Sequence, residues 1–131
     1  MAVAPIMGAT ESHQLSDRDL LTATILGEAR GDGLIGMALV ADVIHERAIR
    51  SNSSPVAVVT APHQFAGSAY RPRLWDGNEV ETARGLAELL LAGEDIVTGV
   101  KFTHFYSGKK MPRWARNMRR QKIGNHVFCQ E

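Results

Sequence analysis

The chain has 131 residues, 44% of them hydrophobic, which is typical of one globular domain with a buried core. Its longest apolar stretch, within residues 34–44, is far too short to span a bilayer, and its one cysteine, Cys129, excludes an internal disulfide. The net charge is only +1, but residues 101–122 hold eight basic residues and no acidic one, which indicates a polyanionic partner for the C-terminal third.

The first predicted element is a helix that follows a flexible tail. Residues 1–14 lack the basic start and the apolar run of a secretory signal peptide, and we expect them to form a loose tail. Ser16, followed three residues later by Asp19 and then by apolar residues, predicts an N-capped amphipathic helix that ends at Gly31. Glu28 then lies in the last turn of this helix.

A central helix is predicted next. Residues 34–50 are apolar almost all round up to Asp42 and then become polar, which indicates a largely buried helix whose C-terminal end reaches solvent. Asp42 and Glu46, one turn apart, fit a polar face of this helix. Ser54 before Pro55 then predicts a short helix to about residue 59.

A long loop and a third long helix follow. Residues 61–78 contain scattered prolines and glycines, and loops of this length are usually functional or disordered. Because this loop also carries three aromatic residues, we expect it to be ordered and functional. Asn78 caps a helix that runs to Ala92, and Gly93 stops it.

The periodicity changes from residue 100 onward. Residues 100–106 and 122–129 alternate and are rich in aromatic and branched side chains, which predicts two antiparallel strands. A long basic connection with Pro112 and Trp114 joins them. The sequence therefore predicts one mainly helical α+β domain over residues 15–131, with a small antiparallel sheet.

Motifs that would diagnose a cofactor or a nucleophile are absent from the sequence. It has no Gly-rich phosphate loop, no paired CxxC, no HExxH and no GxSxG. The five histidines lack metal-ligand spacing, although a fold could bring His104 and His126 together across the proposed strand pair. We therefore expect no cofactor and no metal, and we expect the thiol of Cys129 to lie in the core.

Glu28 is the residue with the clearest chemical rationale. It lies among small residues at the end of an otherwise apolar helix, which leaves room for a bulky substrate. A carboxyl group partly withdrawn from water has a raised pKa and can donate a proton near neutral pH, as glycosidic bond cleavage requires. From the pattern alone, a solvated helix end or a pair with Arg30 is the favoured explanation of Glu28.

Several segments occur in the order in which they appear in a known family. The landmarks are Gly27-Glu28-Ala29-Arg30, Gln64-Phe65, Thr98-Gly99, residues 103–106, Trp114 and the IGNHVF segment at residues 123–128. Through these landmarks, residues 19–129 resemble the SleB-like cell-wall hydrolase family, which includes spore-cortex-lytic enzymes.

This resemblance implies a fold and an activity. The implied fold is lysozyme-like, similar to goose lysozyme and the lytic transglycosylases, and the implied activity is cleavage of glycan between N-acetylmuramic acid and N-acetylglucosamine. The resemblance makes Glu28 the general acid. The chain departs from the family pattern at Glu46-Arg47, Ala66 and Ser107-Gly108, where the family usually has Asn-Arg, Ser or Thr, and Asn-Pro. These departures concern substrate contacts and leave Glu28 unchanged.

The reaction type depends on whether a second carboxylate assists Glu28. No partner in the geometry of two-carboxylate glycosidases is evident from spacing. A single acid suits lytic transglycosylation, in which the muramoyl 6-hydroxyl closes a 1,6-anhydro ring, while muramidase hydrolysis stays open as the alternative.

The candidate groove residues are aromatic groups that can stack on sugars and polar groups that can bind acetamido groups. They are Gln64, Phe65, Thr103, Tyr106, Trp114, Asn125 and His126. Core packing is an equal alternative for Phe65 and Thr103, and it is the favoured expectation for Phe102, Phe105 and Phe128.

The leading hypothesis is a peptidoglycan-degrading enzyme, either a phage or prophage endolysin or a host enzyme. As an endolysin, it would stay in the host cytoplasm until a holin gives it passage to the wall. We expect a monomer whose partner is the glycan strand, with neither nucleic-acid binding nor stable membrane insertion. The alternatives are a small nucleic-acid-binding module, in which Trp114 and the basic segment contact bases and phosphates, and a non-catalytic cell-wall-binding domain.

Overall fold

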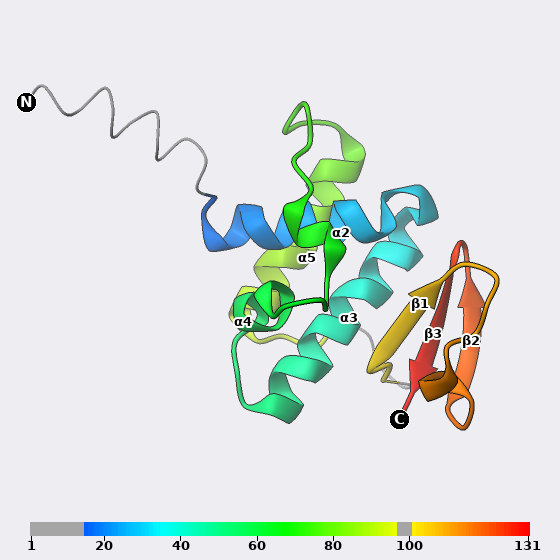
Figure 1. Ribbon diagram of the computed structural model, residues 1–131. Helices are drawn as coiled ribbons and strands as arrows, with labels where there is room; N and C mark the ends of the chain where they lie inside the picture. The colour runs from blue at the N-terminus through cyan, green and yellow to red at the C-terminus, as the bar shows by residue number, and fades with distance from the viewer. Residues whose placement is uncertain (1–14, 97–100) are drawn as a thin grey trace, which may run out of the picture.

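The computed structural model describes residues 15–96 and 101–131 (Figure 1). The elements in chain order are α2 (Asp17–Ala29), η1 (Arg30–Asp32), α3 (Gly33–Ser51), α4 (Pro55–Thr60), η2 (Ala66–Ala69), α5 (Asn78–Ala92), β1 (His104–Ser107), η3 (Arg113–Ala115), β2 (Arg119–Ile123) and β3 (His126–Gln130), where η marks a short 3₁₀ helix. The expected tail over residues 1–14 and the Thr98-Gly99 landmark lie outside the described residues.

Helix α2 begins where the sequence predicts. The Ser16 hydroxyl accepts a hydrogen bond from the backbone N–H of Asp19 at 3.1 Å and so satisfies one of the free N–H groups of the first turn. Residues 21–26 are all buried, including two threonines whose hydroxyls donate to carbonyls one turn earlier. The helix ends at Ala29, so Glu28 lies in its last turn as predicted.

Helix α3 is the central helix that the sequence predicts, but its polar face differs from the prediction. Asp42 is completely buried, whereas the sequence placed it with Glu46 on a polar surface. The backbone N–H of Phe102 donates to Asp42 Oδ2 at 3.3 Å, which gives the buried carboxyl group a partner. The helix ends at Ser51, and its C-cap residue Asn52 adopts a left-handed conformation with φ of 52°.

Helices α4 and α5 also follow local sequence signals. The Ser54 hydroxyl caps α4 by accepting from the N–H of Ala57 at 3.0 Å, with Pro55 in the first turn. Helix α5 begins at Asn78, but Gly77 rather than Asn78 occupies the cap position. Gly93 ends α5 in the left-handed region, as predicted.

The sheet has three antiparallel strands in the order β1-β3-β2, not the two that the sequence predicts. The predicted strand over residues 122–129 is interrupted by a turn at Gly124, which has φ of 60°. This turn makes β2 and β3 a hairpin, and β2 lies inside the basic segment that the sequence assigned to a connection. The prediction failed because β2 is almost entirely exposed and therefore lacks an apolar alternation.

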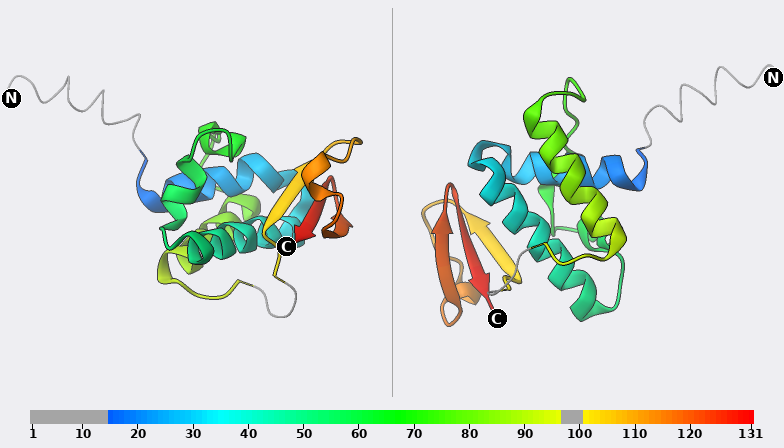
Figure 2. Two further views of the ribbon diagram at one scale, coloured as in Figure 1. Left: turned by 60° about the horizontal axis from the view of Figure 1, so that its bottom comes forward. Right: turned by 180° about the vertical axis from the view of Figure 1, so that it is seen from behind.

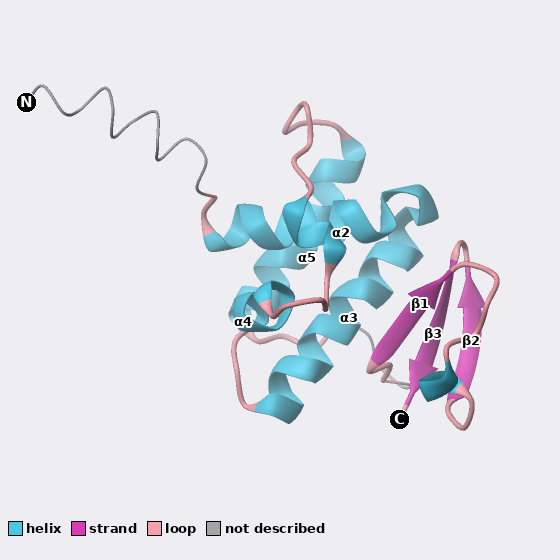
Figure 3. Ribbon diagram, in the orientation of Figure 1, coloured by secondary structure: helices cyan, strands magenta, loops and turns pink. Residues whose placement is uncertain are grey.

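The helices form one body and the sheet packs beside it. Figure 1 and Figure 2 show α2 crossing α3 and α5, with the sheet against the side of α3. Figure 3 shows the same division by secondary structure. Phe128 of the central strand is fully buried and contacts the rings of Phe102 and Phe105, so the sheet contributes to the same core as the helices. This is the α+β, mainly helical arrangement that the sequence predicts.

Within the described ranges, 15–96 and 101–131, no helix is long and apolar enough to cross a membrane.

Candidate active site

The carboxylate of Glu28 is fixed by the loop that follows α4. The side chain is half-buried at the C-terminal end of α2, and its Oε2 accepts a hydrogen bond from the backbone N–H of Gly67 at 2.7 Å. Gly67 belongs to η2, which lies directly against α2 (Figure 1). Glu28 is therefore neither freely solvated nor paired with Arg30, whose guanidinium donates instead to the hydroxyl of Tyr70.

Two glycines make this contact possible. A Cβ atom at Gly67 would lie 2.7 Å from the carbonyl oxygen of Thr24 and 2.9 Å from Cγ of Glu28. A Cβ atom at Gly27 would lie 2.8 Å from Cα of Gly67. Because these distances are shorter than any normal contact, only glycine at both positions lets η2 approach α2 closely enough to bind Glu28.

A smaller cavity, which Glu28 does not line, lies along α3. Figure 1 shows α4 on one side of α3 and β1 on the other. This cavity of about 450 Å³ lies between them, with Gln64 and Ala61 on the α4 side, Arg47 and Arg50 from α3, and Thr103 with His104 on the sheet side. Gln64 is three residues before Gly67, so one loop contributes both to this cavity and to the contact with Glu28.

Arg47 joins the two walls of this cavity. Its Nε donates to the carbonyl oxygen of Thr103 at 2.8 Å, and its Nη1 donates to Oε1 of Gln64 at 3.1 Å. The guanidinium also lies over the ring of Phe65, 5.3 Å from the centroid. Burial lowers the pKa of Arg47.

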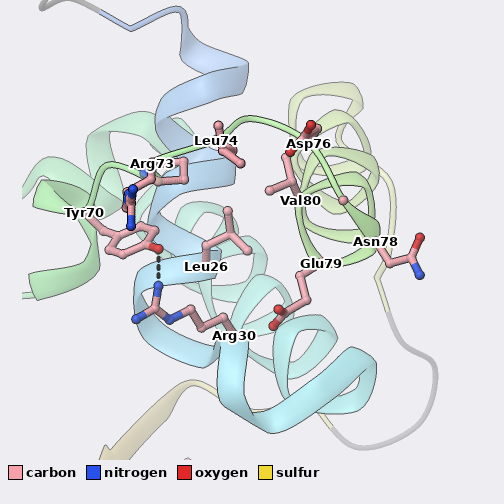
Figure 4. Close-up of a pocket in the computed structure, with 11 residues that line it drawn as sticks. Leu26, Arg30, Tyr70, Arg73, Leu74, Asp76, Asn78, Glu79 and Val80 are labelled. Carbon is pink, nitrogen blue, oxygen red and sulfur yellow. Dashed lines mark hydrogen bonds between the residues drawn. The ribbon is translucent and has the colours of Figure 1, made fainter.

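A larger cavity of about 620 Å³ lies beside the last turn of α2 (Figure 4). Leu26 and Arg30 of α2 line it together with Tyr70 and the loop leading to α5. The guanidinium of Arg30 lies 4.8 Å from the centroid of the Tyr70 ring, which holds this loop against the helix. Glu28 does not line this cavity.

Asp32 ties the end of α2 to the sheet. Its Oδ2 lies 2.5 Å from Nδ1 of His126, and its Oδ1 accepts from the backbone N–H of Asn125 at 3.1 Å. The side chains of Asp32 and His126 are only 2% and 7% exposed. A Cβ atom at Gly124 would lie 2.6 Å from Oδ1 of Asp32, so the glycine is required for this contact as well as for the turn.

The aromatic groups of β1 divide between the two faces of the sheet. Phe105 packs against the rings of Phe65 and His126, while Tyr106 points to the opposite face because side chains alternate along a strand. There Trp114, 48% exposed, contacts the rings of both His104 and Tyr106. Because His104 also lines the smaller cavity, it connects that cavity to Trp114.

The predicted groove residues thus fall into different environments. Gln64 and Thr103 line the smaller cavity, and Tyr106 and Trp114 form the aromatic contact next to it. Phe65, Thr103 and His126 are buried and make the internal contacts given above, while Asn125 lies exposed at the hairpin turn. Contact of these residues with a substrate stays a prediction.

A buried carboxyl group lies elsewhere along α3. Burial raises the pKa of Asp42 to about 6, although the N–H of Phe102 and the charge of Lys101 both act to lower it. Nζ of Lys101 is 3.9 Å from Oδ1 of Asp42 and 3.6 Å from Oδ1 of Asp95. This group of charges joins α3 to the segments before and after the undescribed residues 97–100.

The two histidines considered as a metal pair do not meet. His104 is paired with Cys129 and His126 with Ser107, which places the two imidazoles on opposite faces of the sheet. Over the part of the chain that the structure describes, no three His, Cys, Asp or Glu side chains gather in a group that could hold a metal ion.

The sequence did not single out Gly67, which positions Glu28, or Asp32, which binds His126 and Asn125. Gly67 was only one of several glycines in a long loop. The short run Gly31-Asp32-Gly33 carried a usable signal, since an acidic residue between two glycines marks a tight turn in which a side chain can reach a distant backbone.

The helical body, the small antiparallel sheet and the smaller cavity between them define a lysozyme-like α+β protein. The cell wall hydrolase family model matches residues 31–129, about three quarters of the chain, and the chain belongs to this family. It is accordingly a peptidoglycan-acting enzyme. The matched residues begin at Gly31, so Glu28 lies just before them.

A solved structure has the same fold. The crystal structure of the catalytic domain of the Bacillus cereus SleB protein is similar with a TM-score of 0.63 and 24% sequence identity, covering 90% of this chain and 94% of that chain. A search of curated proteins finds no match. The resemblance to the SleB-like family and the lysozyme-like fold class are both confirmed.

Proposed function

We propose that this protein cleaves the bond between N-acetylmuramic acid and N-acetylglucosamine in peptidoglycan, with Glu28 as its general acid and base. The observation that carries the proposal is the position of the Glu28 carboxylate. Glu28 lies in the last turn of α2, and the N–H of Gly67 binds its carboxylate. The loop that contains Gly67 also contributes Gln64 to the smaller cavity. A fixed and half-buried carboxyl group is suited to proton transfer to a glycosidic oxygen.

In this mechanism one oxygen of Glu28 remains bonded to the Gly67 N–H while the other faces the substrate. Protonated Glu28 gives its proton to the leaving glycosidic oxygen as the bond to the muramic acid C1 breaks. The resulting carboxylate then takes the proton of the muramoyl 6-hydroxyl, whose oxygen bonds to C1 and closes a 1,6-anhydro ring. In the muramidase alternative, water supplies this oxygen instead.

The surroundings of the neighbouring carboxylates favour the version with a single acid. The side chain of Asp32 is bound to His126 and is 2% exposed, and Asp42 is completely buried. Neither carboxylate is open to a groove where it could activate water on the far face of a sugar, as inverting glycosidases require. We therefore propose lytic transglycosylation rather than hydrolysis.

Purified peptidoglycan tests the proposal. We expect the wild-type protein to clear a peptidoglycan suspension and the Glu28→Gln variant to do so more slowly by about 10²- to 10⁴-fold, because the amide cannot donate and accept the proton. Glu88→Gln is the matched control, since Glu88 is an exposed residue on α5 paired with Arg18. Equal clearing by the wild-type protein and Glu28→Gln would contradict the role of Glu28.

The products of the same digest distinguish the two reaction types. A 1,6-anhydro end is lighter than a hydrolysed end by one water, so mass spectrometry of the released fragments separates them. Fragments with only hydrolysed ends would show muramidase chemistry. Absence of clearing by the wild-type protein, together with salt-sensitive binding to DNA or RNA, would favour the nucleic-acid-binding alternative.

We further propose an endolysin role, in which the enzyme waits in the host cytoplasm and reaches the wall through a holin. Expression in a bacterial host tests this role directly. We expect lysis when a holin is co-expressed and none when it is omitted. Lysis of equal extent without the holin would argue against this route.

A further inference from the structure

The smaller cavity contains a guanidinium group that no carboxylate among the described residues contacts. Arg47 is half-buried, and its two described hydrogen bonds go to the carbonyl oxygen of Thr103 and the amide oxygen of Gln64, which are both neutral. Among the described residues, no carboxylate lies within ion-pair distance of Arg47. A guanidinium withdrawn from water without a counter-charge is costly unless a ligand supplies that charge.

The neighbouring arginine shows the difference. Arg50 lines the same cavity, but its Nη1 lies 3.0 Å from Oε1 of Glu131 and its Nε lies 3.9 Å from Oε1 of Glu46. Both nearby carboxylates, Glu131 and Glu46, therefore lie against Arg50. Arg47 has no direct carboxylate contact among the described residues.

His104 adds a further group that can bind an anion. Its Nδ1 lies 2.9 Å from the hydroxyl of Thr103, and its Nε2 has no partner among the described residues. Burial and the nearby guanidinium of Arg47 lower the pKa of His104, which favours the neutral imidazole. Arg47 is therefore the positively charged group for a negative ligand. It can still offer one hydrogen bond to a ligand.

We propose that this cavity binds a carboxylate of peptidoglycan, with Arg47 as the charged binding residue and Gln64 and His104 beside it. Peptidoglycan carries such carboxylates on the lactyl group of muramic acid, where the stem peptide is missing, and on the stem peptide itself. The inference rests on the proposed function, because it assumes that the glycan lies along α3 with its scissile bond at Glu28.

The loop geometry makes simultaneous binding feasible. Gln64 lines the cavity and Gly67 binds Glu28, and three extended residues span at most about 11 Å. A carboxylate in the cavity would therefore fix the position of the sugar chain relative to Glu28. The enzyme would then prefer glycan that carries muramic acid carboxylates over neutral polymers of N-acetylglucosamine.

Binding to matched ligands tests the inference. The inactive Glu28→Gln protein is titrated calorimetrically with soluble glycan fragments that keep their stem peptides, with fragments stripped to free lactyl carboxylates, and with both after conversion of the carboxylates to amides. A charge-assisted hydrogen bond corresponds to roughly a 10- to 100-fold change in affinity. We expect amidation to weaken binding by that factor for the fragment that carries the bound carboxylate. An effect on the fragments with stem peptides identifies the stem peptide as its source, and an effect on the stripped fragments identifies the lactyl group.

Two variants assign the effect to one residue. In the Arg47→Gln background, the affinity ratio of carboxylate to amide ligands should fall to about one, whereas Arg50→Gln should keep the ratio of the parent protein. Because loss of Arg47 also removes its bond to Thr103 and could prevent folding, the ligand comparison with arginine in place stands as an independent measurement.

The outcomes separate this inference from the catalytic proposal. Equal affinity for carboxylate and amide ligands, or no binding of any carboxylate glycan, would overturn the inference even if the wild-type protein clears peptidoglycan. Failure to clear peptidoglycan together with a clear carboxylate preference would instead overturn the catalytic proposal and leave the binding site standing.

Discussion

At the scale of single residues, the backbone N–H of Gly67 does as much to define the candidate site as Glu28 itself. A carboxylate at a helix C-terminus gains nothing from the helix dipole, so its orientation has to come from another element. The hydrogen bond from Gly67 provides that orientation and leaves the second oxygen of Glu28 for a substrate.

Gly67→Ala tests this role. The new methyl group would meet the Thr24 carbonyl and the Glu28 side chain at less than 3.0 Å, and the first of these is backbone that cannot move aside cheaply. We expect η2 to move away from α2, with a loss of about 1–3 kcal/mol in the free energy of unfolding and at least a tenfold loss of clearing activity. Chemical denaturation and the clearing assay measure the two effects.

Gly85→Ala is the matched control, because a Cβ atom at Gly85 meets nothing within 4 Å. It lies in α5, where alanine favours the helix, and should retain activity with unchanged or slightly higher stability. If Gly67→Ala behaves like Gly85→Ala, the close approach of η2 does not position Glu28.

The sequence predicted the location of Glu28 but not the groups that hold it. Its place in a last helical turn follows from the apolar period of a single helix and from nearby stop signals. Its contact with Gly67 joins residues 39 positions apart, and the contact of Asp32 with His126 joins residues 94 apart. Contacts over such separations depend on the packing of several elements and leave little trace in local periodicity.

At the scale of elements, the helix ends were predictable because short-range groups determine them. Ser16, Ser54 and Gly93 each act within four residues of the helix end that they define. The sheet was not predictable in the same way. The side chains of β2 are mostly basic and exposed, so they show no apolar alternation. Gly124, which forms the turn after β2, lies inside residues 122–129, which the sequence predicted as one strand.

The buried side chain of Asp42 gives the junction of α3 with the sheet a pH-dependent stability. In an unfolded chain this carboxyl group ionises near its ordinary pKa of 3.8, whereas in the folded protein its pKa is about 6. As the pH rises from 3.8 to 6, the unfolded state loses its proton first, so the free energy of unfolding falls. The total loss is about 3 kcal/mol and is complete above pH 6.

Asp42→Asn should lack this loss, because the amide oxygen can still accept from the N–H of Phe102 and carries no charge to bury. We expect the unfolding free energy of the variant, relative to that of the wild type, to rise by about 3 kcal/mol between pH 3.5 and pH 7. Denaturant titrations across this range measure the difference. Glu88→Gln should show no such trend, and a constant difference for Asp42→Asn would contradict the assignment.

At the scale of the whole molecule, charge is segregated in space as it is in sequence. β2 and the loops before it carry most of the basic segment at one edge of the sheet, and Arg119 and Lys122 of this edge strand are exposed. The rest of the chain carries seven basic and fourteen acidic residues. A field of this kind attracts an anionic polymer to the sheet side and is screened by salt.

We expect binding to insoluble peptidoglycan to weaken several-fold when salt is raised from about 0.05 to 0.5 M, since the Debye length falls below the separation of exposed charges. The double variant Arg119→Gln and Lys122→Gln should bind more weakly at low salt and show a smaller salt dependence. Cosedimentation with purified cell walls measures both quantities. Arg18→Gln together with Arg71→Gln removes the same charge elsewhere, and an equal effect of both pairs would exclude a special role for β2.

The order of the strands has a consequence for how the protein is made. β3 follows β1 and β2 in the sequence and is the central strand of the sheet, so neither β1 nor β2 has its partner there until synthesis has passed residue 130. His126, which holds Asp32, belongs to the same final strand. One wall of the cavity is therefore assembled only after β3 has been made, and a nascent chain stalled before β3 has its helices but no completed cavity.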